Sequence, residues 1–547
     1  MKRIKLPAYV LALSFIFALA APVFPAGSSE FSDVKTTRWS HDAIRYAVDE
    51  GYMNGVGNGK FDPAGSMTRG MFVTVLWRKE GSPEVGFRPD FTDVKTGKYY
   101  SKAVIWAKDH GIVSGVTDTK FDPNGKITRE QLATMLYRYC SVKNLVVDER
   151  GDVSAFADKS KIHSYAADAM SWAVGKKLIG GVTKDTLVPR GYATREQVAT
   201  ILKRFDETEF TTLADFYREK ANKIADYAEQ MLWEALDKRK ADPGFNPTGC
   251  MEGTIVLGLA ELGRFDFLAE YVDAWMELGD ELRPTEPALF ASVVLLLYEK
   301  TGDEKYADAC RVLKEKLDTW PCDTYGELKY TYELMNNEIY VDGTGVMTPF
   351  LARYGRLFGD GEAEARALLQ VDNYLKYGVD PARKLVNHGY TTGGAGRGEM
   401  GWGRGTGWLM LAVGGVMEDC PDDSVCAACD ALIKNTFRYL SDDNTFSWSL
   451  SEREGPSDSS ATGMIMWGVL KSKEAGYGES VDDGTVKAIA EACLRFFGDD
   501  GIVYGCSGPS GGFGSYSENY NENNGWGQGG ILSFYAALVK YLENTAL

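Results

Sequence analysis

The sequence predicts an all-α protein of two units: an N-terminal bundle of three helical repeats, followed by a C-terminal (α/α)6 toroid of six helical hairpins. A module of helix, glycine-rich loop and helix recurs three times, with a period of roughly 60 residues. From residue 214 onward, roughly a dozen amphipathic helical segments alternate with loops rich in Gly, Pro and Asp. No run of alternating polar and apolar residues indicates a competing set of strands.

Composition limits the possible functions. The chain has 547 residues, a net charge of −17 and 44% hydrophobic residues, which describes a folded acidic protein of several domains. So acidic a chain is not expected to bind nucleic acid, because phosphates require a basic face.

The N-terminus carries an export signal. Residues 1–26 combine basic residues near the start, a short apolar run and small residues suited to cleavage, which predicts a secretory signal peptide. A transmembrane anchor is the alternative, but the run is short and no basic cluster follows it. No later segment has about 18 consecutive apolar residues. We therefore expect a secreted protein with no membrane insertion after signal cleavage.

The three repeats span residues 29–86, 87–150 and 151–206 and share landmarks in the same order. Each opens with an aspartate that follows an aromatic residue, and each has a Thr-Arg pair at which a second helix begins, with the threonine as N-cap. The aspartates are Asp33, Asp93 and Asp158, and the arginines are Arg69, Arg129 and Arg195. Two copies depart from the pattern: the first has Gly70 where the others have Glu, and the third has Leu187-Val188-Pro189 for Phe-Asp-Pro.

These repeats closely resemble the S-layer homology (SLH) domain. The resemblance implies a pseudo-threefold bundle that binds the anionic secondary cell-wall polymer of Gram-positive bacteria, and so a location at the cell wall. It also implies that the six residues above contact the polymer, since a guanidinium suits a carboxylate or phosphate on a sugar chain. The alternative is that each arginine pairs only with neighbouring acids inside the bundle.

A short join at residues 207–213 precedes the second unit, residues 214–547. One predicted helix illustrates the pattern: Asp303 caps it, and Tyr306, Cys310, Leu313 and Leu317 fall on one face. In a toroid of such hairpins, the ends of the inner helices and the loops at one rim line a cavity.

Candidate functional residues gather in the loops of this unit. Asp342 stands at a predicted helix start among apolar neighbours, where a plain N-cap is the alternative. His388 lies in a second cluster, which continues at residues 401–408 with Trp402, Arg404 and Trp408 and four glycines among those eight residues. The glycines allow close approach of a ligand, the tryptophans offer flat faces for sugar rings, and the arginine suits a carboxylate.

Together these clusters resemble glycoside hydrolase family 105, the unsaturated rhamnogalacturonyl hydrolases. The resemblance implies a substrate left by polysaccharide lyases, with a C4=C5 unsaturated uronic acid at its non-reducing end, and hydrolysis by hydration of that enol ether. Asp342 would be the general acid and base, and Glu286 would stand for the family's second acid. Arg404 would hold the uronate carboxylate, Trp402 and Trp408 would wall the ring, and His388 would bond the sugar.

Two alternatives remain open at this point. One is another (α/α)6 glycosidase or epimerase that acts on saturated sugars; the other is a catalytically inactive surface protein that captures carbohydrate. No metal-ligand pattern is present, since three of the four histidines lie in the repeats, so we expect no cofactor.

Overall fold

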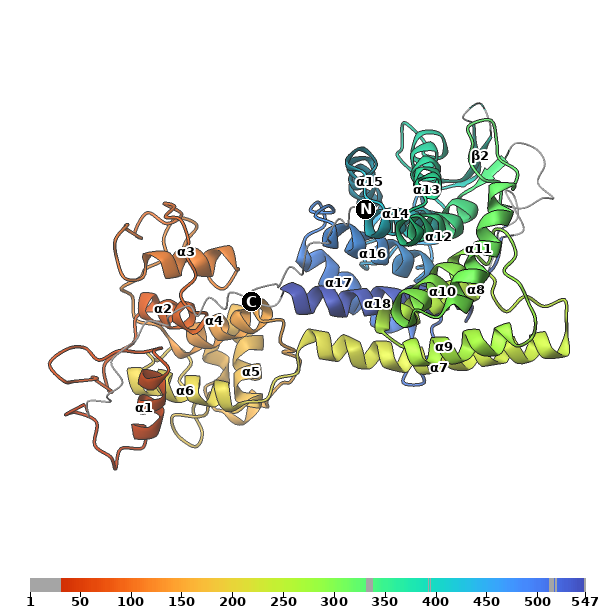
Figure 1. The fold of residues 1–547 in the computed structure, drawn as a ribbon. Helices are drawn as coiled ribbons and strands as arrows, with labels where there is room; N and C mark the ends of the chain where they lie inside the picture. The colour runs from red at the N-terminus through yellow and green to blue at the C-terminus, as the bar shows by residue number, and fades with distance from the viewer. Residues whose placement is uncertain are drawn as a thin grey trace, which may run out of the picture. The chain divides into compact units, whose positions relative to one another are not determined.

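The computed structural model describes residues 31–330, 338–391, 393, 395–510, 516 and 519–545. The predicted signal peptide, residues 1–26, lies outside them. The chain divides into two compact units, the first ending at Phe210 and the second beginning at Thr211 (Figure 1). Both are mainly helical, so the predicted fold class is confirmed. No helix within the described ranges is long and apolar enough to cross a membrane.

The first unit holds two helices from each repeat. They are α1 (His41–Asp49), α2 (Arg69–Lys79), α3 (Ser101–Asp109), α4 (Arg129–Val142), α5 (Ala167–Gly175) and α6 (Arg195–Glu207). As predicted, Thr68, Thr128 and Thr194 are N-caps whose side chains accept a backbone N–H in the first turn. These caps satisfy amide groups that a helix start leaves without a partner, and so fix where each second helix begins.

The three repeats close on one another through backbone hydrogen bonds. Met67 donates to Ala193, Ala193 donates to Ile127, and Ile127 donates back to Met67, at 2.9 to 3.0 Å. One residue from each copy thus forms a triangle at the centre of the bundle. The pseudo-threefold arrangement that the repeats imply follows directly from this closed cycle.

The second unit alternates outer and inner helices. The outer helices are α7 (Leu213–Ala241), α9 (Phe265–Met276), α11 (Glu304–Asp318), α13 (Gly361–Asn373), α15 (Asp423–Thr436) and α17 (Asp483–Cys493). The inner helices are α8 (Cys250–Leu262), α10 (Ala288–Thr301), α12 (Val341–Phe358), α14 (Gly403–Asp419), α16 (Ser459–Glu474) and α18 (Gly525–Thr545). Asp303 caps α11 as predicted, and the apolar face behind it is buried.

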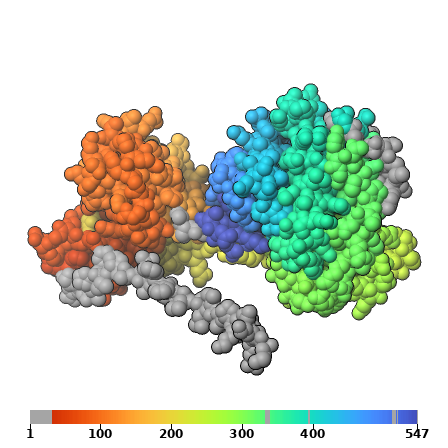
Figure 2. Space-filling view, turned by 45° about the horizontal axis from the view of Figure 1, so that its top comes forward, coloured from red at the N-terminus to blue at the C-terminus, as the bar shows by residue number. Residues whose placement is uncertain are grey.

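The inner helices form a closed ring, because each packs against the next and α18 packs back against α8. In Figure 2 the colours of this unit pass from green through turquoise to blue around one packed body. Glycines at the helix starts allow the close approach. A Cβ on Gly407 would lie 2.8 Å from the Cβ of Met464 in α16, and one on Gly529 would lie 2.4 Å from the backbone of Thr254 in α8.

These contacts join the first turns of neighbouring helices, so the N-termini of the inner helices gather at one rim. Of the glycines around Arg404, Gly403 and Gly407 approach Ala461 and Met464 of α16. Helix packing therefore explains these two glycines, which the sequence interpretation had assigned to a ligand.

A three-stranded antiparallel sheet, which sequence patterning did not reveal, lies at this rim. It consists of β1 (Glu338–Tyr340), β2 (Asn387–Thr391) and β3 (Ala395–Met400), in the order β1-β2-β3. Its strands are short, and two of them contain glycine, so they carry no clear alternation. The sheet matters for function because β1 leads directly into α12 and β2 carries His388.

Candidate functional sites

The aspartates that recur in the three repeats organise loops. Both carboxylate oxygens of Asp33 accept backbone N–H groups, from Phe61 at 2.9 Å and Asp62 at 2.8 Å. Asp93 and Asp158 make the equivalent pairs in the other copies. Burial opposes the charge, but these donors outweigh it and hold the pKa of Asp33 and of Asp158 below the usual range. With their oxygens already engaged, we assign the aspartates a loop-forming role.

The arginines depend on those loops. The Nε of Arg69 donates to the Phe121 carbonyl at 2.9 Å, and Phe121 is the residue whose N–H is held by Asp93. Arg129 and Arg195 repeat the arrangement with Leu187 and Phe61. The alternative that the arginines pair with acids is wrong, since no carboxylate within the described residues lies at ion-pair distance from them. Each aspartate therefore shapes a loop that in turn orients the arginine of another repeat.

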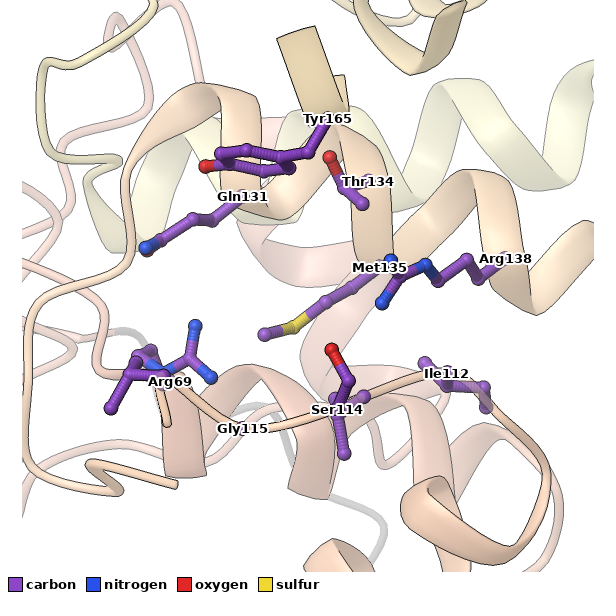
Figure 3. Close-up of a pocket in the computed structure, with 11 residues that line it drawn as sticks. Arg69, Ile112, Ser114, Gly115, Gln131, Thr134, Met135, Arg138 and Tyr165 are labelled. Carbon is purple, nitrogen blue, oxygen red and sulfur yellow. The ribbon is translucent and has the colours of Figure 1, made fainter. Parts of the chain in front are cut away.

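A pocket of about 350 Å³ lies beside Arg69. Figure 3 shows the Arg69 guanidinium and the Met135 side chain pointing into the space between helix α4 and the loop of Ser114 and Gly115, with Tyr165 opposite. The equivalent pocket beside Arg195 has about 340 Å³ and is lined by Asn54 and Tyr99. The grooves thus combine a cation with an exposed aromatic ring, and sequence analysis gave these rings no role.

The grooves differ in how the guanidinium is held. Arg129 and Arg195 each donate a second bond, from Nη2 to the loop carbonyls of Gly180 and Asn54, at 2.5 and 2.6 Å. Arg69 makes only the Nε bond among the described residues. Its two terminal nitrogens are therefore available to a ligand without breaking a bond within the protein.

Because Gly70 has no side chain, the groove beside Arg195 lacks a contact that the groove beside Arg69 has. At its position in the second repeat, Glu130 bonds the ring of His163 at 2.6 Å and the hydroxyl of Tyr165 at 3.2 Å. These bonds hold an aromatic residue at the Arg69 groove. The first copy has no carboxylate there, so Tyr99 lacks the equivalent anchor.

At the rim of the toroid, Asp342 occupies the first turn of α12. The N-cap position belongs to Tyr340, so the interpretation of Asp342 as a plain N-cap is wrong. Its Oδ2 is buried and accepts no hydrogen bond of acceptable geometry within the described chain. The nearest basic group is Nε2 of His388, at 3.3 Å. A carboxylate oxygen without such a bond costs free energy in a structural role, which points to a chemical one.

His388 links Asp342 to a set of aromatic rings. Its Nδ1 lies 2.7 Å from the Tyr516 hydroxyl, which also accepts the backbone N–H of Glu399 at 2.7 Å. The rings of Tyr340 and Trp402 lie 5.3 and 4.3 Å from the imidazole. Asp342, His388 and Trp402 are therefore brought together, as the sequence predicts for a single site.

Glu286 lies just before α10. The Tyr330 hydroxyl donates to it at 3.4 Å, and burial, together with the nearby Glu286 and Asp342 carboxylates, raises the pKa of Tyr330. Tyr330 therefore keeps its proton and lies close enough to both carboxylates for each to affect its pKa. Burial also raises the pKa of the Cys250 thiol to about 12, so that thiol remains protonated.

Arg404 holds a loop at the rim. Its guanidinium is buried and donates to the carbonyls of Ser507 and Gly508 at 2.6 and 2.7 Å, with the rings of Trp402 and Trp526 on its faces. Asp458 accepts the N–H of the same Ser507 at 3.3 Å. Arg404 and Asp458 thus fasten one loop segment across the starts of α14 and α16.

The remaining predicted residue, Trp408, is buried where α14 packs against Gly345 of α12. Its expected stacking on the substrate stays a prediction. Tyr516 and Tyr330 were missed because they stand in loops with no pattern to single them out.

The architecture and the rim residues define the class, an (α/α)6 protein with a carboxylate that faces a histidine at the inner-helix rim. The chain belongs to Glycosyl Hydrolase Family 88, whose model matches residues 264–542, more than half of the chain. Among solved structures, a possible member of the GH105 family from Klebsiella pneumoniae is similar with a TM-score of 0.50 and 17% identity, covering 54% of this chain and 83% of that one. That likeness shows the shared fold.

The S-layer homology domain model matches residues 30–70, 90–133 and 155–199, so the recognition of three SLH domains is confirmed. An endoglucanase from Bacillus sp. (strain KSM-635) is 32% identical over 203 residues, and a surface-layer 125 kDa protein from Lysinibacillus sphaericus is 29% identical over 194. The matches span only 21% and 16% of those proteins' own lengths, and 35% and 34% of this chain.

Proposed function

We propose that the protein is a wall-tethered hydrolase of unsaturated uronyl oligosaccharides, of the kind that rhamnogalacturonan lyases release, with Asp342 as general acid and base. The observation that carries this proposal is the buried Oδ2 of Asp342, which faces His388 among aromatic rings and accepts no hydrogen bond of acceptable geometry in the described chain. Family membership supports the hydrolase class, and the motif resemblance supports the unsaturated substrate.

The helix arrangement favours an anionic sugar. Each inner helix places its N-terminus, the positive end of its dipole, at the rim that holds Asp342. This field attracts a uronate carboxylate, and Arg404 is already engaged with backbone carbonyls. We therefore assign recognition of the carboxylate to the rim as a whole and give Arg404 the task of holding the loop at Ser507.

The reaction follows from these positions. Asp342 in its acid form protonates C4, and the π electrons of the C4=C5 bond form the new C–H bond. Water adds at C5 and gives its proton to the Asp342 carboxylate. The hemiketal then opens by cleavage of the bond between C5 and the ring oxygen, which leaves a ketone at C5 and a hemiacetal at C1. The hemiacetal collapses to an aldehyde and releases the rest of the oligosaccharide.

Neighbouring groups would serve Asp342 in this cycle. His388 lies 3.3 Å from Oδ2 and can stabilise the carboxylate after the proton has left. The Tyr330 hydroxyl donates its one proton to Glu286, so its oxygen is a neutral acceptor for a sugar hydroxyl or for the attacking water. In this arrangement Glu286 orients Tyr330 and does not itself transfer the proton.

The SLH unit would supply the tether. The groove beside Arg69 joins free guanidinium nitrogens to an exposed tyrosine, which suits an acidic sugar of a secondary cell-wall polymer. A hydrolase fixed at the cell surface could then trim lyase products before their uptake.

Absorbance tests the catalytic proposal, since the unsaturated uronate absorbs in the near ultraviolet and hydration abolishes the band. Wild-type protein should bleach a panel of lyase products. Asp342→Asn should lower the rate by at least about 10³-fold, because it removes the proton that the reaction needs. Asp303→Asn, which changes an exposed cap of α11, is the matched control. Equal bleaching by wild type and Asp342→Asn, or bleaching by neither, would refute the proposal.

A further inference from the structure

A second carboxyl group lies behind the site and takes no part in the steps above. Glu327 stands in the turn between α11 and β1, and its side chain is fully buried. One oxygen accepts the Thr344 hydroxyl at 2.7 Å, and the other is bonded to the Tyr390 hydroxyl. A buried acid that bridges two different elements, with no cation among its hydrogen-bond partners in the described part of the chain, calls for an explanation.

The two partners of Glu327 connect it to both halves of the proposed site. Thr344 follows Asp342 by two residues on α12, and Tyr390 follows His388 by two residues on β2. We propose that Glu327 is a positioning residue that holds α12 and β2 together, so that Asp342 and His388 keep their 3.3 Å contact. The proposal rests on the proposed function, since it assigns Glu327 a part in the same reaction.

The protonation state of Glu327 follows from the groups around its carboxyl. Burial raises the pKa of Glu327 to about 8, against the bonds from Tyr390 and Thr344, and the charge of Asp323 adds to the rise. Asp323 lies in the same turn, where its Oδ1 accepts the N–H groups of Tyr325 and Glu327 while its buried Oδ2 has no hydrogen-bond partner in the described chain.

The other titratable groups that face Glu327 are tyrosines. Tyr390 comes from β2 and Tyr374 from the turn after α13, and burial raises the pKa of both, so they remain neutral. At neutral pH Glu327 is therefore an uncharged acid that bridges Thr344 and Tyr390. Above about pH 8 it becomes a buried anion beside Asp323, which destabilises the link between α12 and β2.

Three substitutions test this role through the pH profile of bleaching by the full chain. Glu327→Gln preserves a neutral bridge, so kcat near pH 7 should stay within about 3-fold of wild type, and the loss of activity near pH 8 should disappear. Glu327→Ala removes the bridge and should lower kcat by about 10–100-fold with KM nearly unchanged. Asp323→Asn removes the neighbouring charge that raises the pKa of Glu327, so the loss of activity at alkaline pH should move to lower pH.

The control is Glu362→Gln, an exposed position at the start of α13, which should leave the profile unchanged. Wild-type kcat in Glu327→Ala, or an unchanged alkaline loss in Glu327→Gln, would overturn the proposal.

A second measurement separates this proposal from the proposed function. The chain has four histidines, so nitrogen NMR of ¹⁵N-histidine-labelled protein can follow His388 after assignment with His388→Gln. We expect Glu327→Ala to shift the His388 ring signals and its titration, and Glu327→Gln to leave them near the wild-type positions. If wild type bleaches no lyase product, the proposed function fails while this outcome still decides the positioning role. Unchanged His388 signals in Glu327→Ala would refute it.

Discussion

Replacing Glu327 by Gln should stabilise the second unit relative to wild type, and this difference should grow as the pH rises. The side chain is fully buried and its pKa rises from 4.5 to about 8 on folding. The folded state therefore binds a proton that the unfolded chain releases above pH 4.5, and wild-type stability falls between pH 4.5 and about 8. At about 1.4 kcal/mol per pH unit, this gap corresponds to a loss of about 5 kcal/mol across that range.

The Gln variant has no such proton to lose. The difference in unfolding free energy between variant and wild type should be near zero or slightly unfavourable at pH 4.5, and should rise by several kcal/mol in favour of the variant by about pH 9. Urea unfolding of the full chain, followed by circular dichroism at several pH values, measures it. A difference that stays constant with pH would refute the reasoning that Glu327 is buried as a neutral acid.

Three further predictions concern other parts of the chain. Val188 has a φ of 51°, which strains a β-branched residue, whereas the other copies have Asp62 and Asp122 at this position. Val188→Asp should therefore stabilise the SLH unit by about 1 kcal/mol in thermal unfolding. A lower stability of the variant would contradict the strain argument. Arg69→Ala should weaken binding to purified anionic wall polymer more than Arg129→Ala does, with exposed Arg45→Ala as control; equal losses would show that the terminal nitrogens of Arg69 are not special. Burial opposes the charge of Glu261, but Lys471 and Lys540, each at 2.7 Å, lower its pKa to about 2. Its contribution to stability is therefore present above pH 4.5 and lost as the pH falls toward 2. If Glu261→Gln leaves acid unfolding unchanged, this prediction is wrong.

The sequence predicted the helices well because they carry strong local signals. Thr68, Thr128 and Thr194 cap helices where expected, and the apolar face behind Asp303 is buried as its spacing indicates. The sheet that carries His388 was missed because its strands hold too few residues to show a period of two.

Site residues were harder to interpret than to find. Asp342 and His388 do lie together, but their partner Tyr516 stands more than a hundred residues further along the chain, in a segment with no periodic pattern. The glycines near Arg404 were assigned to a ligand, although Gly403 and Gly407 allow α16 to approach α14. Sequence spacing does not distinguish these uses, because both demand the absence of a Cβ atom at one point.

The most direct test of the central claim compares one uronyl disaccharide in its unsaturated and saturated forms, with sugar release as the readout. The account predicts release from the unsaturated form alone, because protonation by Asp342 requires the C4=C5 double bond. Release from the saturated disaccharide at a similar rate would contradict it and would favour a glycosidase that acts at the anomeric carbon.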